Sequence, residues 1–380
     1  MGEIVMSKKE QKLYEQAVQV ICERLTIVEF AILSNKSYRQ SQRIIKKVEI
    51  QGMKGIKHGN KCKIPYNKTS DELEMDIHAL LKGKYYDFNL THFKEMIEVH
   101  EGISVGKNIV HRIATKNGLV KRAKRNQRSR AHKPRPRMPQ EGMLIQFDGS
   151  SHIWFGGFES DLIGGIDDAT GKVVGCEFFI GETSLNCMKV MRDIIETEGV
   201  PHAFYLDKAG AFGKDDRDQT STQIGRALNE INCDIILAGS APAKGKIERL
   251  WNTFQDRLIA ELRFYEIRTM PKANEFLKND FIPRFNENFS YPARDSKKAY
   301  RELTQDLKNI FCVKERRKIS SGNTFSWNNA TYILNKDRNY KFRTININTH
   351  YSGNTTFDIM GSEVSASLHT AVSRITSLAA

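Results

Sequence analysis

The chain has 380 residues, of which 39% are hydrophobic, and a formal charge of +14 at pH 7. This length is too great for a single compact core and predicts roughly two to four domains, and the 20 phenylalanines argue against wholesale disorder. The excess of Lys and Arg indicates a polyanionic partner, with nucleic acid favoured over an anionic membrane.

The sequence does not favour a membrane or secreted protein. No apolar run approaches the roughly 20 residues that cross a bilayer, and the N-terminus lacks the apolar segment of a signal peptide. The six cysteines are scattered without a CxxC pair, which argues against a zinc site and against a disulfide framework. We therefore expect a cytoplasmic protein that associates with nucleic acid.

Residues 8–60 are predicted to form a helical DNA-binding domain. Thr26 can cap one short helix, Asn35 suits a left-handed turn, and Ser37 can cap a second helix. Two short helices joined by a tight turn match the helix-turn-helix layout, whose second helix enters the major groove of DNA. The polar side of that second helix supplies the DNA-binding candidates Arg39, Gln40, Arg43 and Lys46. The alternative is an ordinary helical hairpin with a solvated basic face.

Residues 68–120 are predicted to form a second helix-turn-helix or winged-helix module. We expect Ser104 to cap its last helix and Gly118 to end it. The side chains of this helix that could reach DNA are Lys107, Asn108 and Arg112.

A basic linker is expected over residues 121–138, with nine Lys or Arg between positions 121 and 137. Runs of like charge are usually solvated, and this one could be a plain hinge. Because counterion release rewards clustered cations on DNA, we expect the linker to follow the phosphate backbone. Its candidate contacts are Lys121, Arg122, Lys124, Arg125, Arg128 and Arg130.

Residues 139–310 are predicted to form an α/β domain with a mixed sheet. Three β-type runs separated by turn signals would pair antiparallel. They cover 142–150, 161–170 and 172–182. Helices and strands then alternate up to a long helix over 244–267, which would add parallel strands to the sheet. The turn sequence DDATG gives its two aspartates, Asp167 and Asp168, a structural role.

A small β-barrel-like domain is predicted over residues 311–350, where short runs alternate as strands do. Residues 351–380 show no interpretable pattern, and we expect a tail of unknown role. The fold class is thus multidomain, with all-α modules first, an α/β domain in the middle and a β domain last.

Three acids of the α/β domain lie at positions suited to catalysis. Asp148 is expected at the end of the first strand, Asp207 at the end of a later strand, and Glu248 one turn into the long helix. Each alone also fits a structural role, as a loop cap or a helix-dipole partner. Three convergent carboxylates repel one another unless a divalent cation such as Mg²⁺ or Mn²⁺ neutralises them. Two such ions can activate a nucleophile and stabilise the leaving oxygen of a phosphodiester.

Three blocks of the α/β domain carry a resemblance to a known family: LIQFDGSSHIWF, GGIDDATGKVVG and SAPAKGKIERLWNTFQDRLIAELR, and two upstream stretches share it: LSNKSYRQSQRIIKKV and EGISVGKNIVHRIATKNGLVKRAKR. They resemble bacterial insertion-sequence transposases of the ISNCY type, within the DDE retroviral-integrase superfamily, over roughly residues 20–335. The resemblance implies an RNase H-like catalytic core in which Asp148, Asp207 and Glu248 hold two Mg²⁺ or Mn²⁺ ions. The sequence YLDKAGAF around Asp207 departs from the pattern of many relatives. The segment that follows it also contains Asp215, Asp216 and Asp218.

The resemblance implies an enzyme that binds double-stranded DNA at terminal inverted repeats and at a target. It would cleave and join DNA strands as a homo-oligomer on paired ends, in the cytoplasm on the nucleoid. The long-helix block adds the DNA-binding candidates Lys244, Lys246 and Arg249. Two alternatives remain open: an inactive DNA-binding regulator derived from a transposase, and a nuclease of the same fold without strand transfer.

Overall fold

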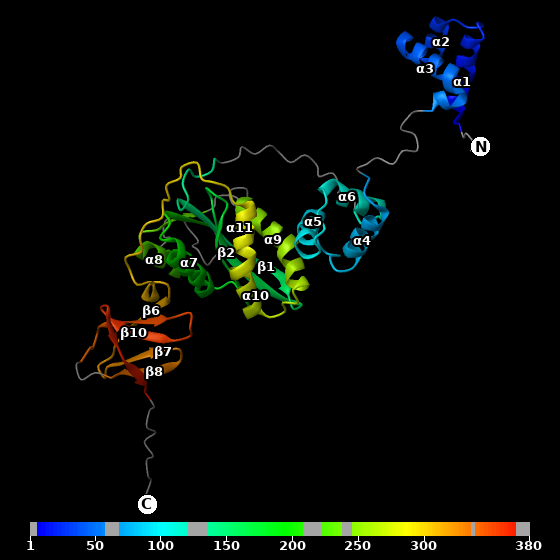
Figure 1. The fold of residues 1–380 in the computed structure, drawn as a ribbon. Helices are drawn as coiled ribbons and strands as arrows, with labels where there is room; N and C mark the ends of the chain where they lie inside the picture. The colour runs from blue at the N-terminus through cyan, green and yellow to red at the C-terminus, as the bar shows by residue number, and fades with distance from the viewer. Residues whose placement is uncertain are drawn as a thin grey trace, which may run out of the picture. The chain divides into compact units, whose positions relative to one another are not determined.

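The computed structural model describes residues 6–57, 68–120, 136–207, 222–237, 245–335 and 339–369. The chain divides into two compact units, Met1–Met75 and Asp76–Ala380, and Figure 1 shows the elements of each. Across the described ranges, no helix combines the length and apolar character needed to span a membrane.

The first unit is a three-helix bundle. Its elements are α1 (Lys8–Ile21), α2 (Ile27–Ser34), α3 (Tyr38–Gln51) and the 3₁₀-helix η1 (Gly52–Ile56). Ala17, Phe30 and Val48 form the buried centre, one residue from each α-helix.

The helix boundaries predicted for the first unit are confirmed. The Thr26 hydroxyl accepts from the Glu29 amide at 3.3 Å, and the Glu29 carboxylate accepts from the Thr26 amide at 2.8 Å. Asn35 has φ 52° at the end of α2. The Ser37 hydroxyl accepts from the Gln40 amide at 3.3 Å and caps α3. These reciprocal caps satisfy amide groups that a helix start leaves unpaired.

The second helical module contains α4 (Asp71–Lys82), α5 (Leu90–His100) and α6 (Lys107–Lys116). The predicted cap of its last helix is wrong, because α6 begins at Lys107 after Gly106 and has no side-chain cap. The Ser104 hydroxyl instead donates to the Glu98 carboxylate at 2.9 Å, within the loop before α6. The boundary of the compact units at Met75 leaves most of this module in one unit with the α/β domain.

The α/β domain contains a five-stranded mixed sheet, as predicted. Its strands are β1 (Leu144–Phe155), β2 (Phe158–Asp167), β3 (Val173–Phe179), β4 (Ala203–Leu206) and β5 (Asp234–Leu237). Their order is β3-β2-β1-β4-β5. The first three strands pair antiparallel, and β4 and β5 run parallel to β1.

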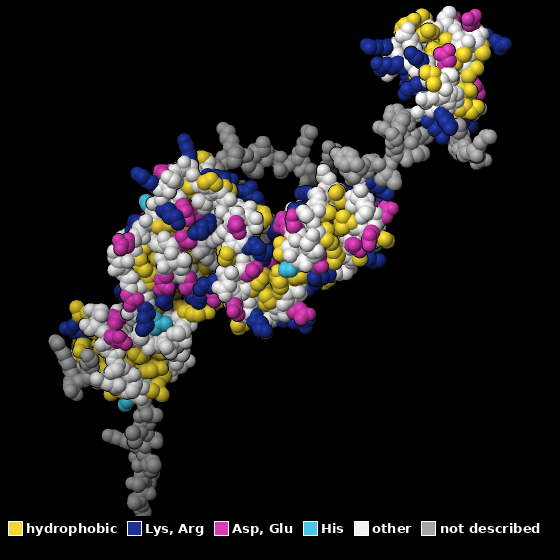
Figure 2. Space-filling view, in the orientation of Figure 1, with side chains coloured by type: hydrophobic (Ala, Val, Ile, Leu, Met, Phe, Trp, Pro, Cys, Tyr) yellow, Lys and Arg dark blue, Asp and Glu magenta, His cyan; other side chains and the backbone are white. Residues whose placement is uncertain are grey.

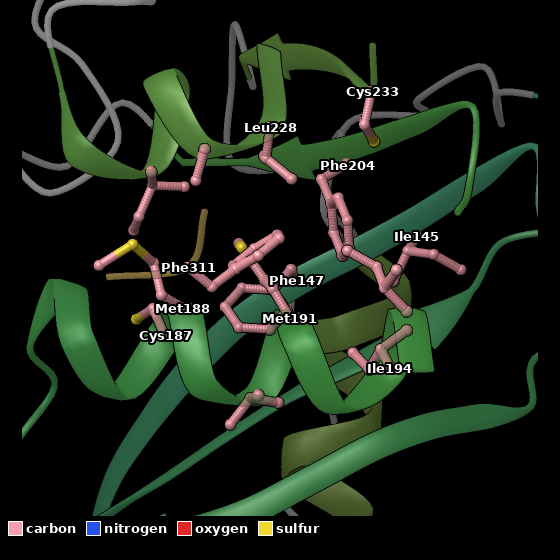
Figure 3. Packing of buried hydrophobic residues seen from close by; sticks show 14 of the residues in the cluster. Ile145, Phe147, Cys187, Met188, Met191, Ile194, Phe204, Leu228, Cys233 and Phe311 are labelled. Carbon is pink, nitrogen blue, oxygen red and sulfur yellow. The ribbon is translucent and has the colours of Figure 1, made fainter. Parts of the chain in front are cut away.

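Helices cover both faces of this sheet (Figure 1). One face packs on α7 (Ser184–Glu198) and α8 (Gln223–Glu230), and Figure 3 shows the apolar side chains that meet there. Ile145 and Phe147 of β1 and Phe204 of β4 point toward Met191 and Ile194 of α7. Burying a large apolar side chain in such a core contributes about 1.5–3 kcal/mol.

The other face packs on α9 (Gly245–Phe264), α10 (Met270–Phe276), the π-helix η4 (Leu277–Phe281) and α11 (Ile282–Phe289). One face of α9 is apolar and buried: Ile247, Leu250, Trp251, Phe254 and Leu258. Trp154 of β1 and Phe178 of β3 pack on this side of the sheet.

The edge strand β3 is covered by two asparagine side chains. Asn286 accepts from the Val173 amide at 2.8 Å and donates to the Val173 carbonyl at 2.9 Å. Asn274 makes the same two bonds with Phe178, at 2.7 and 3.2 Å. Each amide group thereby replaces part of a sixth strand and blocks edge-to-edge pairing at this position.

The strand β1 is longer than predicted, which corrects the position of Asp148. The strand continues to Phe155 because its second half pairs with β2 as a long hairpin. Asp148 therefore lies within the strand rather than at its end. It lies just beyond Gln146, the last β1 residue paired with β4.

The C-terminal domain consists of two small antiparallel sheets. Its strands are β6 (Val313–Lys318), β7 (Thr324–Trp327), β8 (Ala330–Leu334), β9 (Thr344–Thr349), β10 (Thr355–Ile359), β11 (Ser362–Val364) and β12 (Ala366–Leu368). The sheet orders are β11-β10-β9-β6 and β12-β8-β7. The last three strands lie within residues 351–380, where we expected only a tail, so the β domain extends past its predicted end at residue 350.

Candidate active site

The strand β1 provides the base of the candidate site. Because side chains alternate between the faces of a strand, Gln146, Asp148 and Ser150 share the face opposite Ile145 and Phe147. The Gln146 side-chain oxygen accepts from the Ile247 amide of α9 at 3.3 Å. The Ser150 hydroxyl accepts from the Gln255 side-chain amide of α9 at 3.2 Å. Asp148 thus lies between two contacts that attach α9 to the strand.

The parallel pairing of β1 with β4 runs toward Asp148 and Asp207. Gln146 of β1 is the parallel partner of Tyr205 of β4, the observed pairs stop there, and β4 ends at Leu206, one residue before Asp207. If the register continued for two residues, Asp148 would lie opposite Asp207, and parallel neighbours in a sheet lie about 4.8 Å apart along the hydrogen bonds. The two aspartates therefore lie toward the same edge of the sheet.

Glu248 lies in the first turn of α9 and is exposed. It precedes Gln255 by seven residues, or about two helical turns, so both side chains share one face of α9. Gln255 contacts Ser150, and Ile247 contacts Gln146. The carboxylate of Glu248 is therefore on the part of α9 that runs beside Asp148.

A buried ionic network fixes the start of α9. The Asp168 carboxylate is 3.0 Å from the Lys246 ammonium group and accepts from the Gln146 side-chain amide at 2.8 Å. It also accepts from the Met138 amide at 2.9 Å. Asp168 is 0% exposed, so the turn that precedes β3 holds the strand and the helix together. The structural role predicted for Asp168 is confirmed.

Asp167 also has the structural role predicted for it. Its carboxylate accepts from the Gly142 amide at 2.9 Å and from the Thr170 amide and hydroxyl at 2.8 Å each. Burial raises the pKa of Asp167, and these hydrogen bonds oppose that rise.

Glu182 is an acid near the site that the sequence did not single out. A Cβ added to Gly149 would lie 2.5 Å from a Glu182 carboxylate oxygen, so this carboxylate lies against β1 at the residue next to Asp148. Burial raises the pKa of the Cys187 thiol well above its usual range, and the charges of Glu182, Asp148 and Asp161 add to that rise. In the sequence, Glu182 precedes the cap residue Thr183 and gives no catalytic signal.

The acids are suited to a hard divalent cation, because carboxylate oxygens are the ligands that Mg²⁺ and Mn²⁺ prefer. As the side chains stand, however, the described part of the chain contains no group of three or more His, Cys, Asp or Glu that could hold a metal ion. The three acids thus lie on β1, directly after β4 and in the first turn of α9.

The predicted DNA-binding residues are distributed over several elements. Figure 2 shows basic side chains projecting from the surface of the chain. Exposed members of the set are Arg39, Gln40, Arg43 and Lys46 on α3, Lys107, Asn108 and Arg112 on α6, and Arg249 on α9. Lys246 differs, because its side chain is 15% exposed and pairs with Asp168. The linker candidates and Lys244 lie outside the described residues.

Sequence relatives identify the family. The chain is 32% identical over 346 residues to "Putative transposase y4bF" of Sinorhizobium fredii, covering 89% of this chain and 75% of that protein. It is 28% identical over 337 residues to "Transposase for insertion sequence IS1202" of Streptococcus pneumoniae, covering 79% and 72%. The chain belongs to the insertion-sequence transposases. No protein-family model matches it.

Solved structures similar to this transposase include retroviral integrases. The HTLV-2 integrase catalytic core domain in complex with magnesium is 15% identical, with a TM-score of 0.30, over 37% of this chain and 88% of that one. The simian T-cell lymphotropic virus intasome in complex with PP2A regulatory subunit B56 gamma is 11% identical, with a TM-score of 0.34, over 72% and 95%. Because both scores are low, the family assignment depends on the sequence relatives. The predicted fold class is confirmed by the structure itself, as a helical N-terminal region, a mixed five-stranded sheet and small C-terminal antiparallel sheets.

Proposed function

We propose that this transposase, of the ISNCY type, binds the ends of its element and catalyses metal-dependent DNA cleavage followed by strand transfer. The observation that supports the proposal is the register of the parallel pair, in which Gln146 pairs with Tyr205; continued by two residues, it would bring Asp148 and Asp207 together near the first turn of α9. Asp148, Asp207 and Glu248 would hold two Mg²⁺ or Mn²⁺ ions. When bound, these ions would activate the attacking oxygen and stabilise the leaving oxygen.

The chain's own residues would orient the acids and the DNA. Gln146 and Ser150 hold α9 against β1, so Glu248 stays beside Asp148. The buried partners of Asp168 fix the first turn of the helix that carries Glu248. Such preorganisation matters because a site loses rate when its ligands must be ordered during the reaction.

Cationic side chains on other elements would hold double-stranded DNA. Those of α3 and α6 would read the terminal repeats and those of the 121–138 linker would track phosphates, in keeping with the net charge of +14. We further propose that the enzyme acts as a homo-oligomer on paired ends, in the cytoplasm on the nucleoid.

The test is incubation of the purified chain with Mg²⁺ and DNA that carries the flanking ends of its own gene, scored for cleavage and joining. Cleaved and joined products are expected, and EDTA should remove both. Cleavage without joining would indicate a nuclease, and binding without cleavage would indicate a regulator.

A further inference from the structure

The two halves of α9 have different partners. The first half carries Glu248 and contacts β1 through Ile247 and Gln255. The second half, from Asp256 onward, contacts the second helical module over residues 84–100. A single uninterrupted helix therefore connects the candidate site to that module.

Two arginines of α9 hold the module by paired bonds. The Arg257 guanidinium donates to both oxygens of Glu95, at 2.6 and 3.3 Å. The Arg263 guanidinium donates to both oxygens of Asp87, at 2.6 and 2.5 Å, and to the Lys84 carbonyl at 3.1 Å. Two-point contacts of this kind fix orientation as well as distance.

The centre of the interface is buried. His92 Nε2 lies 2.8 Å from a Glu261 carboxylate oxygen, and the two side chains are only 1% and 2% exposed. Burial alone would raise the pKa of Glu261, but hydrogen bonds with His92 and Arg284 lower it overall, so this carboxylate stays charged. The ring of Tyr85 stacks on that of Phe264 with centroids 5.2 Å apart. The α5–α9 interface therefore combines a buried charged hydrogen bond with aromatic stacking, as expected for a stable contact.

The helix α6 belongs to the same module. Val110, Ile113 and Ala114 are buried, and the polar side of α6 exposes Lys107, Asn108 and Arg112. Between Glu248 and Glu261 the helix α9 advances thirteen residues, or about 20 Å. That length is comparable to roughly six base pairs of B-DNA.

We propose that the α5–α9 interface acts as a ruler, holding the DNA segment contacted by α6 at a fixed distance from the phosphate that is cut. This inference rests on the proposed function, because it requires that the acids cleave DNA. Its residues Asp87, His92, Glu95, Arg257, Glu261 and Arg263 are positioning residues that touch neither DNA nor metal.

The first experiment changes the DNA. The segment contacted by α6 is located by comparing the footprints of the wild type and of the Lys107→Ala/Arg112→Ala variant on one terminal repeat. Two base pairs are then inserted between this segment and the cut. A ruler moves the cut by two base pairs, so that its distance from the α6 footprint is unchanged. A cut that stays at its original phosphate, or a footprint that the double variant leaves unaltered, would overturn the proposal.

The second experiment changes the interface. Glu95→Arg places a second positive charge opposite Arg257, and the repulsion should loosen the α5–α9 interface. Cleavage should then spread over neighbouring phosphates, and amide hydrogen exchange in α5 should rise. The double variant Glu95→Arg/Arg257→Glu restores an opposite-charge pair and should restore the single cut. Arg192→Glu, which breaks the exposed pair with Glu196 on α7, is the matched control and should cleave as the wild type does.

The two levels of failure are distinguishable. A wild type that never cleaves contradicts the proposed function and with it the ruler. A wild type that cleaves, with Glu95→Arg cutting the same phosphate equally well despite faster exchange in α5, contradicts the ruler alone.

Discussion

Asp148 lies between Gln146 and Ser150 on one face of β1, and only Asp148 of the three carries a carboxylate. Gln146 and Ser150 accept hydrogen bonds from α9, whereas Asp148 between them contributes a carboxylate. We expect Asp148→Asn, Asp207→Asn or Glu248→Gln to reduce cleavage by about a thousandfold, because losing a metal ligand removes several kcal/mol of transition-state stabilisation. DNA binding should stay near the wild-type value. Cleavage assays and gel-shift titrations on the same DNA measure the two effects.

The matched control for these variants is Asp193→Asn, an acid on α7 that is paired with Lys189. It removes the same charge away from the candidate site and should leave cleavage unchanged. Full activity in Asp148→Asn or Glu248→Gln would refute their assignment as ligands. If only Asp207→Asn lost activity, Asp207 would have to bind the metal ions with two acids other than Asp148 and Glu248.

Lys246 allows a second test at the scale of residues. We expect Lys246→Met to lower the free energy of unfolding by about 3 kcal/mol, because it leaves the Asp168 carboxylate buried without its cation. Adding Asp168→Asn should recover most of that loss by removing the buried charge. Denaturant unfolding of the single and double variants measures both changes.

Lys94→Met is the comparison for that measurement, since Lys94 pairs with Glu98 near the surface, where the two side chains are 31% and 43% exposed. More exposed pairs contribute little, so its effect should be below about 1 kcal/mol. If Lys246→Met resembles Lys94→Met in stability but weakens DNA binding, Lys246 is a DNA contact after all.

The sequence identified some of these residues and not others for a physical reason. Asp148, Asp207 and Glu248 stood out because acids near predicted strand and helix ends can be placed by local pattern. Neither the position of Glu182 nor the pairing of Lys246 with Asp168 could be found this way. Their positions depend on contacts between segments far apart in the chain, such as Gly149 with Glu182 and Asp168 with Lys246.

At the scale of elements, local chemistry also decides which predictions succeed. Thr26 and Ser37 cap helices because their partners lie three residues away. Ser104 has a competing acceptor in Glu98, which the preceding helix brings close, so its hydroxyl turns away from α6. The extension of β1 to Phe155 likewise depends on its pairing with β2. The strands β10 to β12 are short and rich in Ser and Thr, so their own sequence predicts no strand. They form because β10 pairs with β9 and β12 pairs with β8.

The helix α3 carries a prediction about DNA sequence specificity. Its first turns expose Arg39, Gln40 and Arg43, while Val48 is buried in the bundle. Arg can pair with guanine and Gln with adenine, each good contact being worth about 1–3 kcal/mol of discrimination. Arg39→Ala or Arg43→Ala should therefore cost about that much on the terminal repeat and much less on random DNA. A competition assay between the two DNAs at fixed salt measures the difference.

Gln19→Ala, an exposed substitution on α1, is the control for that assay. Equal losses on specific and random DNA would show that α3 contacts only the backbone. In that case α6, with Lys107, Asn108 and Arg112, would be the helix that reads sequence.

At the scale of the whole molecule, the basic residues behind the net charge of +14 can contact DNA in two ways, at the bases or at the phosphates. Phosphate contacts position a protein on DNA but carry no direct sequence information. The linker prediction therefore differs in kind from that for α3. Replacing Lys121, Arg122, Lys124 and Arg125 with Gln should weaken binding to all DNA sequences alike.

The salt dependence gives this last prediction its quantitative form. Each phosphate contact contributes about −0.9 to the slope of log affinity against log salt, so losing four contacts should flatten the slope by about 3 to 4. The same number of neutralised charges at Lys8, Lys9, Lys12 and Lys36 in the first unit provides a control for net charge alone. A linker variant whose slope equals that of the wild type would mean that the segment only connects the second module to the α/β domain. A slope reduced equally in the linker variant and the control would mean that overall charge, rather than the linker, determines how strongly DNA is held.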